Sequence, residues 1–204
     1  MNKVKQAEKK TFKAGEELRM RILDAASQLF GKEGYENVSI KRIAEGAGCS
    51  QMAMYRHFPD KNALIRHLCT ELYRQFTIHL HEKYDSLPAP KERLLRALRD
   101  FILVSHKNPH HYRLTFLMAT HDPDAGAVRE AVANPAISYF RQTLKLALPP
   151  DASAELVEER LHQILATLHG MTIMLIAHPR VYGLTREMAL RQFESAFRLL
   201  IGEA

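Results

Sequence analysis

Residues 39–61 read SIKRIAEGAGCSQMAMYRHFPDK, and this stretch predicts two short helices joined by a tight turn. Ser39 and Ser50 each precede a helical apolar pattern, and a serine hydroxyl in that place caps a helix by accepting a backbone N–H. Gly48 supplies the backbone freedom that a tight turn requires, and Pro59 ends the second helix. Two helices across a glycine-containing turn are typical of a helix-turn-helix, whose second helix enters the major groove of DNA.

A longer stretch, residues 35–65 (YENVSIKRIAEGAGCSQMAMYRHFPDKNALI), closely resembles the DNA-binding domain of the TetR/AcrR family of bacterial transcriptional regulators. The matching features are the Ser39-capped helix, Ile43-Ala44, Ala47-Gly48, Tyr55, His57-Phe58, Lys61 and Ala63-Leu64. The resemblance extends back to Ile22, where ILDAASQLFGKEGY is similar to the first helix of the family. It implies an all-α fold, with an N-terminal three-helix DNA-binding domain and a C-terminal helical domain for ligand binding and dimerisation.

The second helix of this motif carries the side chains expected to read DNA. Arginine pairs bidentately with guanine and glutamine with adenine, so Arg56 and Gln51 are the candidates for base contacts. Tyr55 either contacts phosphate, which the resemblance favours, or packs as a core ring. Met52 departs from the small residue that the family often has there, whereas Met54 and Phe58 are expected in the core. The complete set of expected DNA-binding residues is Ser39, Lys41, Ser50, Gln51, Met52, Ala53, Tyr55, Arg56, His57 and Lys61.

Composition places the chain among globular proteins with a basic end. Its 204 residues are 46% hydrophobic and 25% charged, with a net charge of +6. Most of that charge lies in residues 1–67, which is the asymmetry expected of a chain that contacts phosphate. A solubilising basic tail is the alternative explanation. Two cysteines, no secretory signal and no membrane-length apolar run predict a cytoplasmic protein.

The order of the segments predicts two domains. Residues 1–15 are expected to be a disordered basic tail that either follows the DNA backbone or takes no part in binding. Residues 16–60 are expected to form the helix-turn-helix domain, and residues 61–204 the effector-binding and dimerisation domain. Apolar periodicity and capping residues predict helices at 16–33, 60–84, 91–106, 110–120, 128–148, 155–177 and 185–201. Pro135 is expected to kink or split the fifth of these.

The resemblance implies a small-molecule pocket and a two-fold interface in the C-terminal part. The candidates for pocket lining are Phe76, Phe101, Tyr112, Phe116, Tyr139, His169 and Met171. The candidates for the dimer interface are Leu161, Leu165, Leu168, Phe193, Phe197 and Leu200. Residues 165–176 (LATLHGMTIMLI) also look like a C-terminal domain type with a Trp…His-Gly signature, although Leu165 stands at the tryptophan position.

No pattern in the chain predicts catalysis, a cofactor or a metal. The eleven histidines have no ligand spacing, and HExxH, paired CxxC, P-loop and GxGxxG motifs are missing from the sequence. The expected protein is therefore a homodimeric regulator, most simply a repressor released from a palindromic operator by an apolar or aromatic molecule. Its rivals are a DNA-binding accessory protein controlled by a protein partner, and an enzyme that uses the histidines.

Overall fold

The structure is a computed structural model, and it describes residues 2–117, 125–177 and 179–202. Within these ranges the chain forms helices and no strands, so the all-α class is confirmed. The chain divides into two compact units, of which the first comprises Met1–Leu72 and His110–Arg129 and the second comprises Tyr73–Pro109 and Glu130–Ala204.

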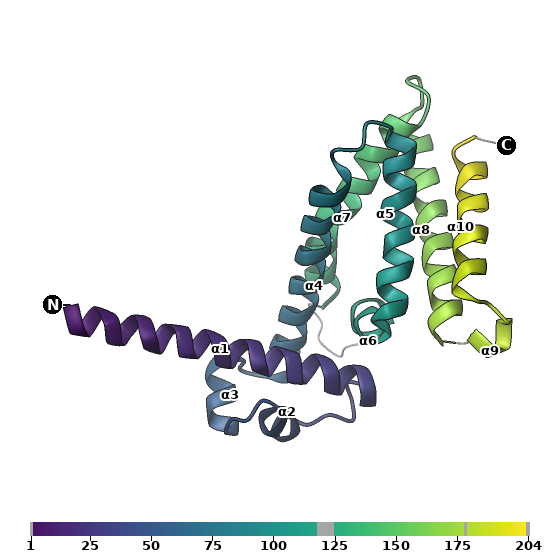
Figure 1. The fold of residues 1–204 in the computed structure, drawn as a ribbon. Helices are drawn as coiled ribbons and strands as arrows, with labels where there is room; N and C mark the ends of the chain where they lie inside the picture. Colours follow the sequence, from purple (N-terminus) through teal and green to yellow (C-terminus); the bar gives the residue numbers. More distant parts are fainter. Residues whose placement is uncertain (1, 118–124, 178, 203–204) are drawn as a thin grey trace. The chain divides into compact units, whose positions relative to one another are not determined.

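The first unit is built around the helix-turn-helix (Figure 1). It contains α1 (Asn2–Glu33), α2 (Ile40–Gly46), α3 (Gln51–His57) and the beginning of α4 (Lys61–Tyr84). The amphipathic faces of these helices bury one apolar core, whose members include Ile22, Ala26, Phe30, Ile43, Met54, Phe58, Leu64 and Leu68. This core holds α2 and α3 against α1, so the turn between them has a fixed support.

Helix α1 is longer than the sequence pattern predicted. Residues 2–15 continue it without a break, where a disordered tail was expected. The segment is rich in lysine and also contains alanine, glutamate and glutamine, all of high helix propensity, and its first glycine or proline is Gly15. Because these residues lack an apolar face that needs burial, sequence reasoning weighted their polarity above their propensity.

A segment far along the chain completes the first unit. It consists of α6 (Pro109–Tyr112) and a π-helical turn, Arg113–Leu117. Leu114 is 2% exposed and belongs to the same core, and the Cys69 Sγ lies 3.8 Å from its carbonyl oxygen. A Cβ atom on Gly31 would lie 1.9 Å from the Cβ of His110, so α1 requires glycine where this segment crosses it. The first unit therefore extends beyond the predicted limit at residue 60.

The second unit is a set of packed helices. It contains the rest of α4, α5 (Pro90–Lys107), most of α7 (Ala125–Ala147), α8 (Ala154–Ala177), α9 (Pro179–Tyr182) and α10 (Arg186–Leu200). Helices α5, α8 and α10 pack on one another (Figure 1). Arg99 Nη1 lies 2.5 Å from Glu194 Oε2 and ties α5 to α10, while Arg141 Nε lies 2.6 Å from Glu158 Oε1 and ties α7 to α8.

Three expectations about this part of the chain have different outcomes. Helix α7 is continuous through Pro135, so the expected split does not occur. The short helix α9 was missed, because four residues are too few to show an apolar period. The gap between the predicted helices 110–120 and 128–148 lies mostly outside the described residues.

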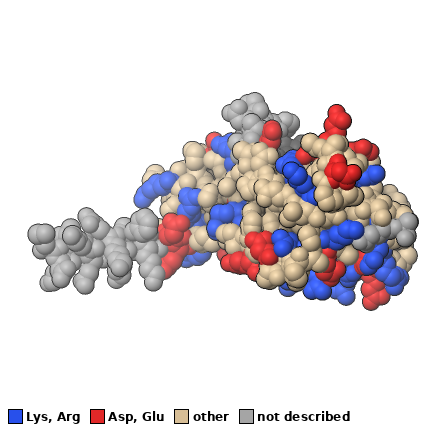
Figure 2. All heavy atoms as spheres, turned by 90° about the horizontal axis from the view of Figure 1, so that it is seen from above, with Lys and Arg blue, Asp and Glu red and all other residues tan. Residues whose placement is uncertain are grey.

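Charged side chains of both signs are mixed on the face of the molecule that is drawn in Figure 2. Figure 2 shows Lys and Arg side chains interspersed with Asp and Glu over the face that it draws. Among the helices of the described ranges, none is both long enough and apolar enough to cross a bilayer.

Candidate nucleic-acid interface

Side-chain caps fix the two short helices in place. The Ser39 Oγ accepts the backbone N–H of Arg42 at 3.2 Å, and the Ser50 Oγ accepts that of Ala53 at 3.1 Å. Both caps are as predicted. Gly48 has φ +66°, a left-handed conformation that glycine adopts without strain, and it provides the turn between the helices. The start of α3 is therefore defined by its own sequence.

One side of α3 is anchored in the core of the first unit. Met54 is fully buried, and Phe58, which follows the helix, is 3% exposed. Both were expected in the core. Ile43 and Ala44 of α2 are buried as well. The anchoring leaves the opposite side of α3 free to meet a partner.

The exposed side of α3 carries four of the ten residues predicted to contact DNA. Met52 is 71% exposed and Tyr55 is 49% exposed, so the tyrosine ring lies at the surface and not in the core. Gln51 and Arg56 are exposed too. Within the described part of the chain, Arg56 has no hydrogen-bond or ion-pair partner, so its guanidinium is available to a ligand. The structure thus brings these side chains together on one surface.

The basic groups around the motif differ in availability. Lys41 is exposed and lies at the 4.0 Å limit of an ion pair with Glu45. Arg42 is held by both carboxylate oxygens of Glu33, at 2.8 and 2.7 Å, and was not among the predicted contacts. Lys61 is half-buried, and its Nζ lies 3.9 Å from the centre of the Tyr35 ring. Burial lowers the pKa of Lys61, and nearby Glu36 opposes that shift.

The remaining predicted contacts surround this surface. Ser39 and Ser50 are exposed, and their hydroxyls are engaged as helix caps. Ala53 and His57 are partly exposed on α3. Their role in DNA contact remains a prediction.

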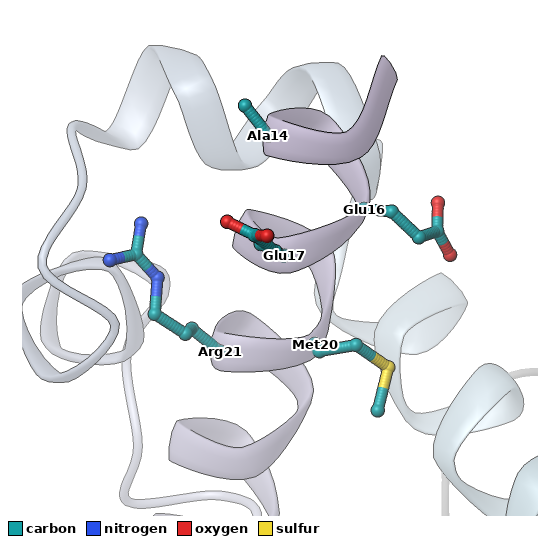
Figure 3. Close-up of a pocket in the computed structure, with 5 residues that line it drawn as sticks. All are labelled: Ala14, Glu16, Glu17, Met20 and Arg21. Atoms are coloured by element: carbon teal, nitrogen blue, oxygen red, sulfur yellow. The ribbon is translucent and has the colours of Figure 1, made fainter. Parts of the chain in front are cut away.

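A surface hollow on α1 lies in the same unit. Its described lining residues are Ala14, Glu16, Glu17, Met20 and Arg21. Figure 3 shows Glu17 and Arg21 on one side of the helix and Glu16 and Met20 on the other. All five come from one helix, which cannot enclose a ligand, so we assign no binding role to the hollow.

Part of the predicted effector pocket forms a cluster in the second unit. The Phe101 ring lies 5.7 Å from Phe76 and 5.3 Å from His169, measured between ring centres. Phe140, which the sequence reasoning missed, lies 6.2 Å from Phe76. Burial lowers the pKa of His169 and favours its neutral form. The Tyr139 ring lies instead beside the His81 ring, with 4.9 Å between the ring centres. Burial, followed by the nearby Asp85 carboxylate, raises the pKa of Tyr139 to about 12.

Other predicted pocket residues lie elsewhere. Tyr112 and Phe116 belong to the first unit, where their ring centres are 5.0 Å apart. Met171 is two residues from His169 on α8, which places the two side chains on opposite sides of the helix. Helix α8 is apolar on several sides, so its composition alone did not show that His169 and Met171 lie on different sides of it.

Most of the predicted dimer residues are buried inside the single chain. Leu161, Leu168, Phe193 and Phe197 are each 2% exposed or less. They fill the space between α5, α8 and α10 and are not accessible to a second subunit. Leu165 and Leu200 are partly exposed. The sequence reasoning identified apolar residues on α8 and α10 without knowing which of their faces α5 covers.

A different face of α8 is accessible and uncharged. It contains Ala166, Thr167, Gly170, Ile173 and Met174, all partly or fully exposed. From Leu165 to Ala177 the helix carries no Asp, Glu, Lys or Arg. A Cβ atom added to Gly170 would meet no other atom within 4 Å in the described chain. Within the described residues, no other helix therefore packs closely on Gly170.

The described residues contain no group of three or more His, Cys, Asp and Glu side chains placed to hold a metal ion. His110 and His111 do lie together, with ring centres 4.6 Å apart. Burial, followed by the neighbouring His110, lowers the pKa of His111. Two imidazoles without a further ligand do not make a structural metal site.

Comparison with known proteins identifies the helix-turn-helix region. Residues 22–68 match the family model described as "Bacterial regulatory proteins, tetR family". An HTH-type transcriptional regulator of Staphylococcus aureus (strain MRSA252) is 33% identical over 98 residues, which are 47% of this chain and 52% of that protein. The chain thus spans about half the length of the curated relatives it matches.

Solved structures share the whole fold at low sequence identity. The transcriptional regulator FadR from Bacillus subtilis, in complex with stearoyl-CoA, has a TM-score of 0.76 at 16% identity and covers 91% of this chain and 98% of its own. A regulator from Saccharomonospora viridis in complex with choline has a TM-score of 0.75 at 19% identity, covering 88% and 95%. These likenesses extend the fold assignment to the second unit. The proposed Trp-His-Gly subtype receives no support from them.

Proposed function

Because the chain is a member of the TetR family of bacterial transcriptional regulators, we propose that it is a cytoplasmic homodimeric repressor that a small neutral molecule releases from a palindromic operator. The observation that carries the proposal is the exposed side of α3, where Met52 and Arg56 lie opposite the buried Met54 and the exposed Gln51 and Tyr55 lie beside them. The family consists of DNA-binding regulators without enzymatic activity, which removes the enzyme alternative.

The expected mode of DNA binding follows from the geometry of α3. Its exposed side chains enter the major groove, and Arg56 donates to a guanine edge. Lys41 supplies a phosphate contact from the preceding helix. In a two-fold dimer the two recognition helices must lie about 34–36 Å apart, one turn of the duplex, to bind the two half-sites together.

The dimer contact is assigned to the uncharged face of α8. Gly170 leaves open space there, and the neighbouring Ala166 and Thr167 are also small. Small side chains allow two helix backbones to approach closely. Leu165, Leu200 and the 65% exposed Leu199 provide further apolar surface on α8 and α10.

The effector is expected to be uncharged and largely apolar or aromatic. The cluster of Phe76, Phe101, Phe140 and His169 offers ring surfaces and a neutral imidazole. Apart from tyrosine hydroxyls, the buried polar side chains of the described residues are those of serine and threonine, and none of them carries a charge. A charged ligand would lose its hydration there without gaining an opposite charge, which is costly.

Release requires that the effector favour a conformer that fits the operator poorly. Helix α4 runs from the first unit into the second, and α5 leads directly into the segment 109–117 that packs on α1. A ligand that shifts α4 or α5 therefore acts on the unit that carries α3. The coupling is reciprocal, so DNA must weaken effector binding by the factor by which the effector weakens DNA binding.

The proposal is tested by footprinting the purified protein at stated salt on the DNA upstream of its own gene, together with selection from random duplexes. A protected, approximately palindromic site is the expected result. Retention that is diffuse and disappears with salt on every sequence would contradict operator binding.

A thermal-shift screen of neutral apolar compounds tests the effector. A ligand present at a hundred times its Kd stabilises the folded state by about 2.7 kcal/mol, which is easily detected. Any hit must also release the bound duplex. The alternative is a DNA-binding accessory protein that a protein partner controls. Operator binding that responds to a protein partner and to no compound would support that alternative.

A further inference from the structure

We infer that Met52 determines part of the sequence specificity by reading the 5-methyl group of a thymine beside the guanine read by Arg56. The inference deepens the proposed function and rests on it. Its starting point is an unusual side chain: Met52 is 71% exposed although it is fully apolar.

The position of Met52 is set by the burial of Met54. Successive residues of an α-helix are rotated by about 100°, so two residues correspond to about 200°. Met52 and Arg56 each lie two residues from the fully buried Met54 and therefore point away from the core. They are four residues apart and neighbours on the same face. The centre of the exposed surface is thus an apolar group beside a guanidinium.

The other exposed residues lie to the sides of this pair. Gln51 and Tyr55 are rotated by about 60–100° from Met54, and Ala53 and His57 by similar angles in the opposite sense. A helix that presents its outermost face to the floor of the major groove brings Met52 and Arg56 deepest. The flanking side chains then lie closer to the groove walls and the phosphates.

The chemistry of the groove identifies the target of each residue. Guanine offers two acceptors, O6 and N7, which match the donors of Arg56. A thioether side chain has no strong hydrogen-bonding group, and the thymine methyl is the apolar feature of the major groove. Four residues of a helix span about 6 Å, whereas stacked bases repeat every 3.4 Å or so. The thymine is therefore expected within about two base pairs of the guanine.

The test replaces thymine by deoxyuridine, which removes the methyl and keeps the base pair. The probe is a duplex selected by the wild-type protein from random sequence, with each thymine changed in turn. Loss of one buried methyl corresponds to about a fourfold loss of affinity. We expect this loss at one thymine per half-site, close to the guanine that Arg56 reads. That guanine is identified by replacing it: on the altered duplex, Arg56→Ala should bind as well as wild type.

The matched variant is Met52→Ala, which alters a surface side chain and leaves the core intact. It should bind the thymine duplex about fourfold more weakly than wild type does. Its affinities for the thymine duplex and the deoxyuridine duplex should be equal. Arg56→Ala should keep the methyl dependence. Circular dichroism and thermal unfolding verify that both variants are folded.

Each outcome decides the inference. A specific duplex without any methyl-dependent thymine would overturn the role of Met52 and leave operator binding intact. Methyl dependence that persists in Met52→Ala would assign the contact to Ala53 or Tyr55 and also overturn it. Failure to select any specific duplex would contradict the proposed function, and this inference with it.

Discussion

The guanidinium of Arg56 and the ammonium of Lys41 are both exposed, and they are expected to act differently on DNA. Arg56→Ala should cost about 1–3 kcal/mol of binding free energy at the preferred operator and relax the choice of one base pair. Lys41→Ala should weaken binding to all duplexes equally and reduce the salt dependence by about one charge. Titrations of matched and mismatched duplexes at several salt concentrations separate the two, and equal losses for Arg56→Ala on every duplex would refute base recognition.

A polar cluster in the first unit makes its stability dependent on pH. The Arg19 guanidinium donates to the His67 ring at 3.0 Å and lies 5.1 Å above the Phe58 ring. Burial, followed by the Arg19 charge, lowers the pKa of His67, whereas Glu71 and Glu16 partly raise it. The unfolded chain then binds more protons than the folded one, so the free energy of unfolding should fall as the pH drops from about 6.5.

His67→Gln provides the control, because the amide oxygen can accept from Arg19 without titrating. The variant should lose less stability than wild type between pH 7.5 and pH 5.5, as measured by thermal unfolding at each pH. The pKa values of His111 and His169 are lowered too. Both histidines are present in wild type and in the variant, so their contributions to the pH dependence of stability are the same in the two proteins. Identical pH profiles would show that His67 does not titrate as proposed.

At the scale of the helices, the contact of α1 with the segment 109–117 is a test of the first unit. Alanine at Gly31 would gain about 1 kcal/mol of helix propensity, but its Cβ would lie 1.9 Å from the His110 Cβ. Overpacking should prevail and destabilise the protein by about 1–3 kcal/mol. Denaturant unfolding measures the change. The cost should shrink when His110→Gly removes the opposing atom, and a Gly31→Ala variant more stable than wild type would contradict the contact.

What sequence could predict at this scale depended on the range of the interactions. The caps at Ser39 and Ser50 and the apolar stripe of α2 are local, and the structure confirms them. The place of Leu114 in the first core depends on residues more than forty positions away, such as Cys69. No local pattern encodes that pairing, so the sequence did not predict that Tyr112 and Phe116 belong to the first unit.

For the molecule as a whole, the unit of function is expected to be the dimer, and the sequence did not indicate which face of α8 is accessible. Helix α8 is apolar on several sides, and α5 and α10 cover the side with Leu161 and Leu168. The side with Gly170 is left for a partner. Which side remains uncovered follows from the packing of three helices, and a hydrophobic pattern read from one helix does not contain that information.

Gly170→Leu tests this face. Nothing in the described chain lies within 4 Å of the added Cβ, so the protomer should accept the substitution and gain about 1 kcal/mol of helix propensity. A partner helix packed closely against Gly170 would be pushed away, so the dimer should dissociate at concentrations where wild type remains associated. Because two half-sites are then no longer held together, operator affinity should fall as well.

Sedimentation velocity over a dilution series measures the dissociation constant, with circular dichroism as the measure of folding. Gln142→Leu, on the exposed surface of α7, adds a leucine of the same size on a helix outside the proposed contact and should leave association unchanged. Equal dissociation constants for Gly170→Leu and wild type would place the interface on another face. The thermal stability of monomeric Gly170→Leu is then compared with that of wild type diluted until it is monomeric. A more stable variant would show that Gly170 lowers the stability of the single chain, as expected of a residue that serves the contact with the partner subunit.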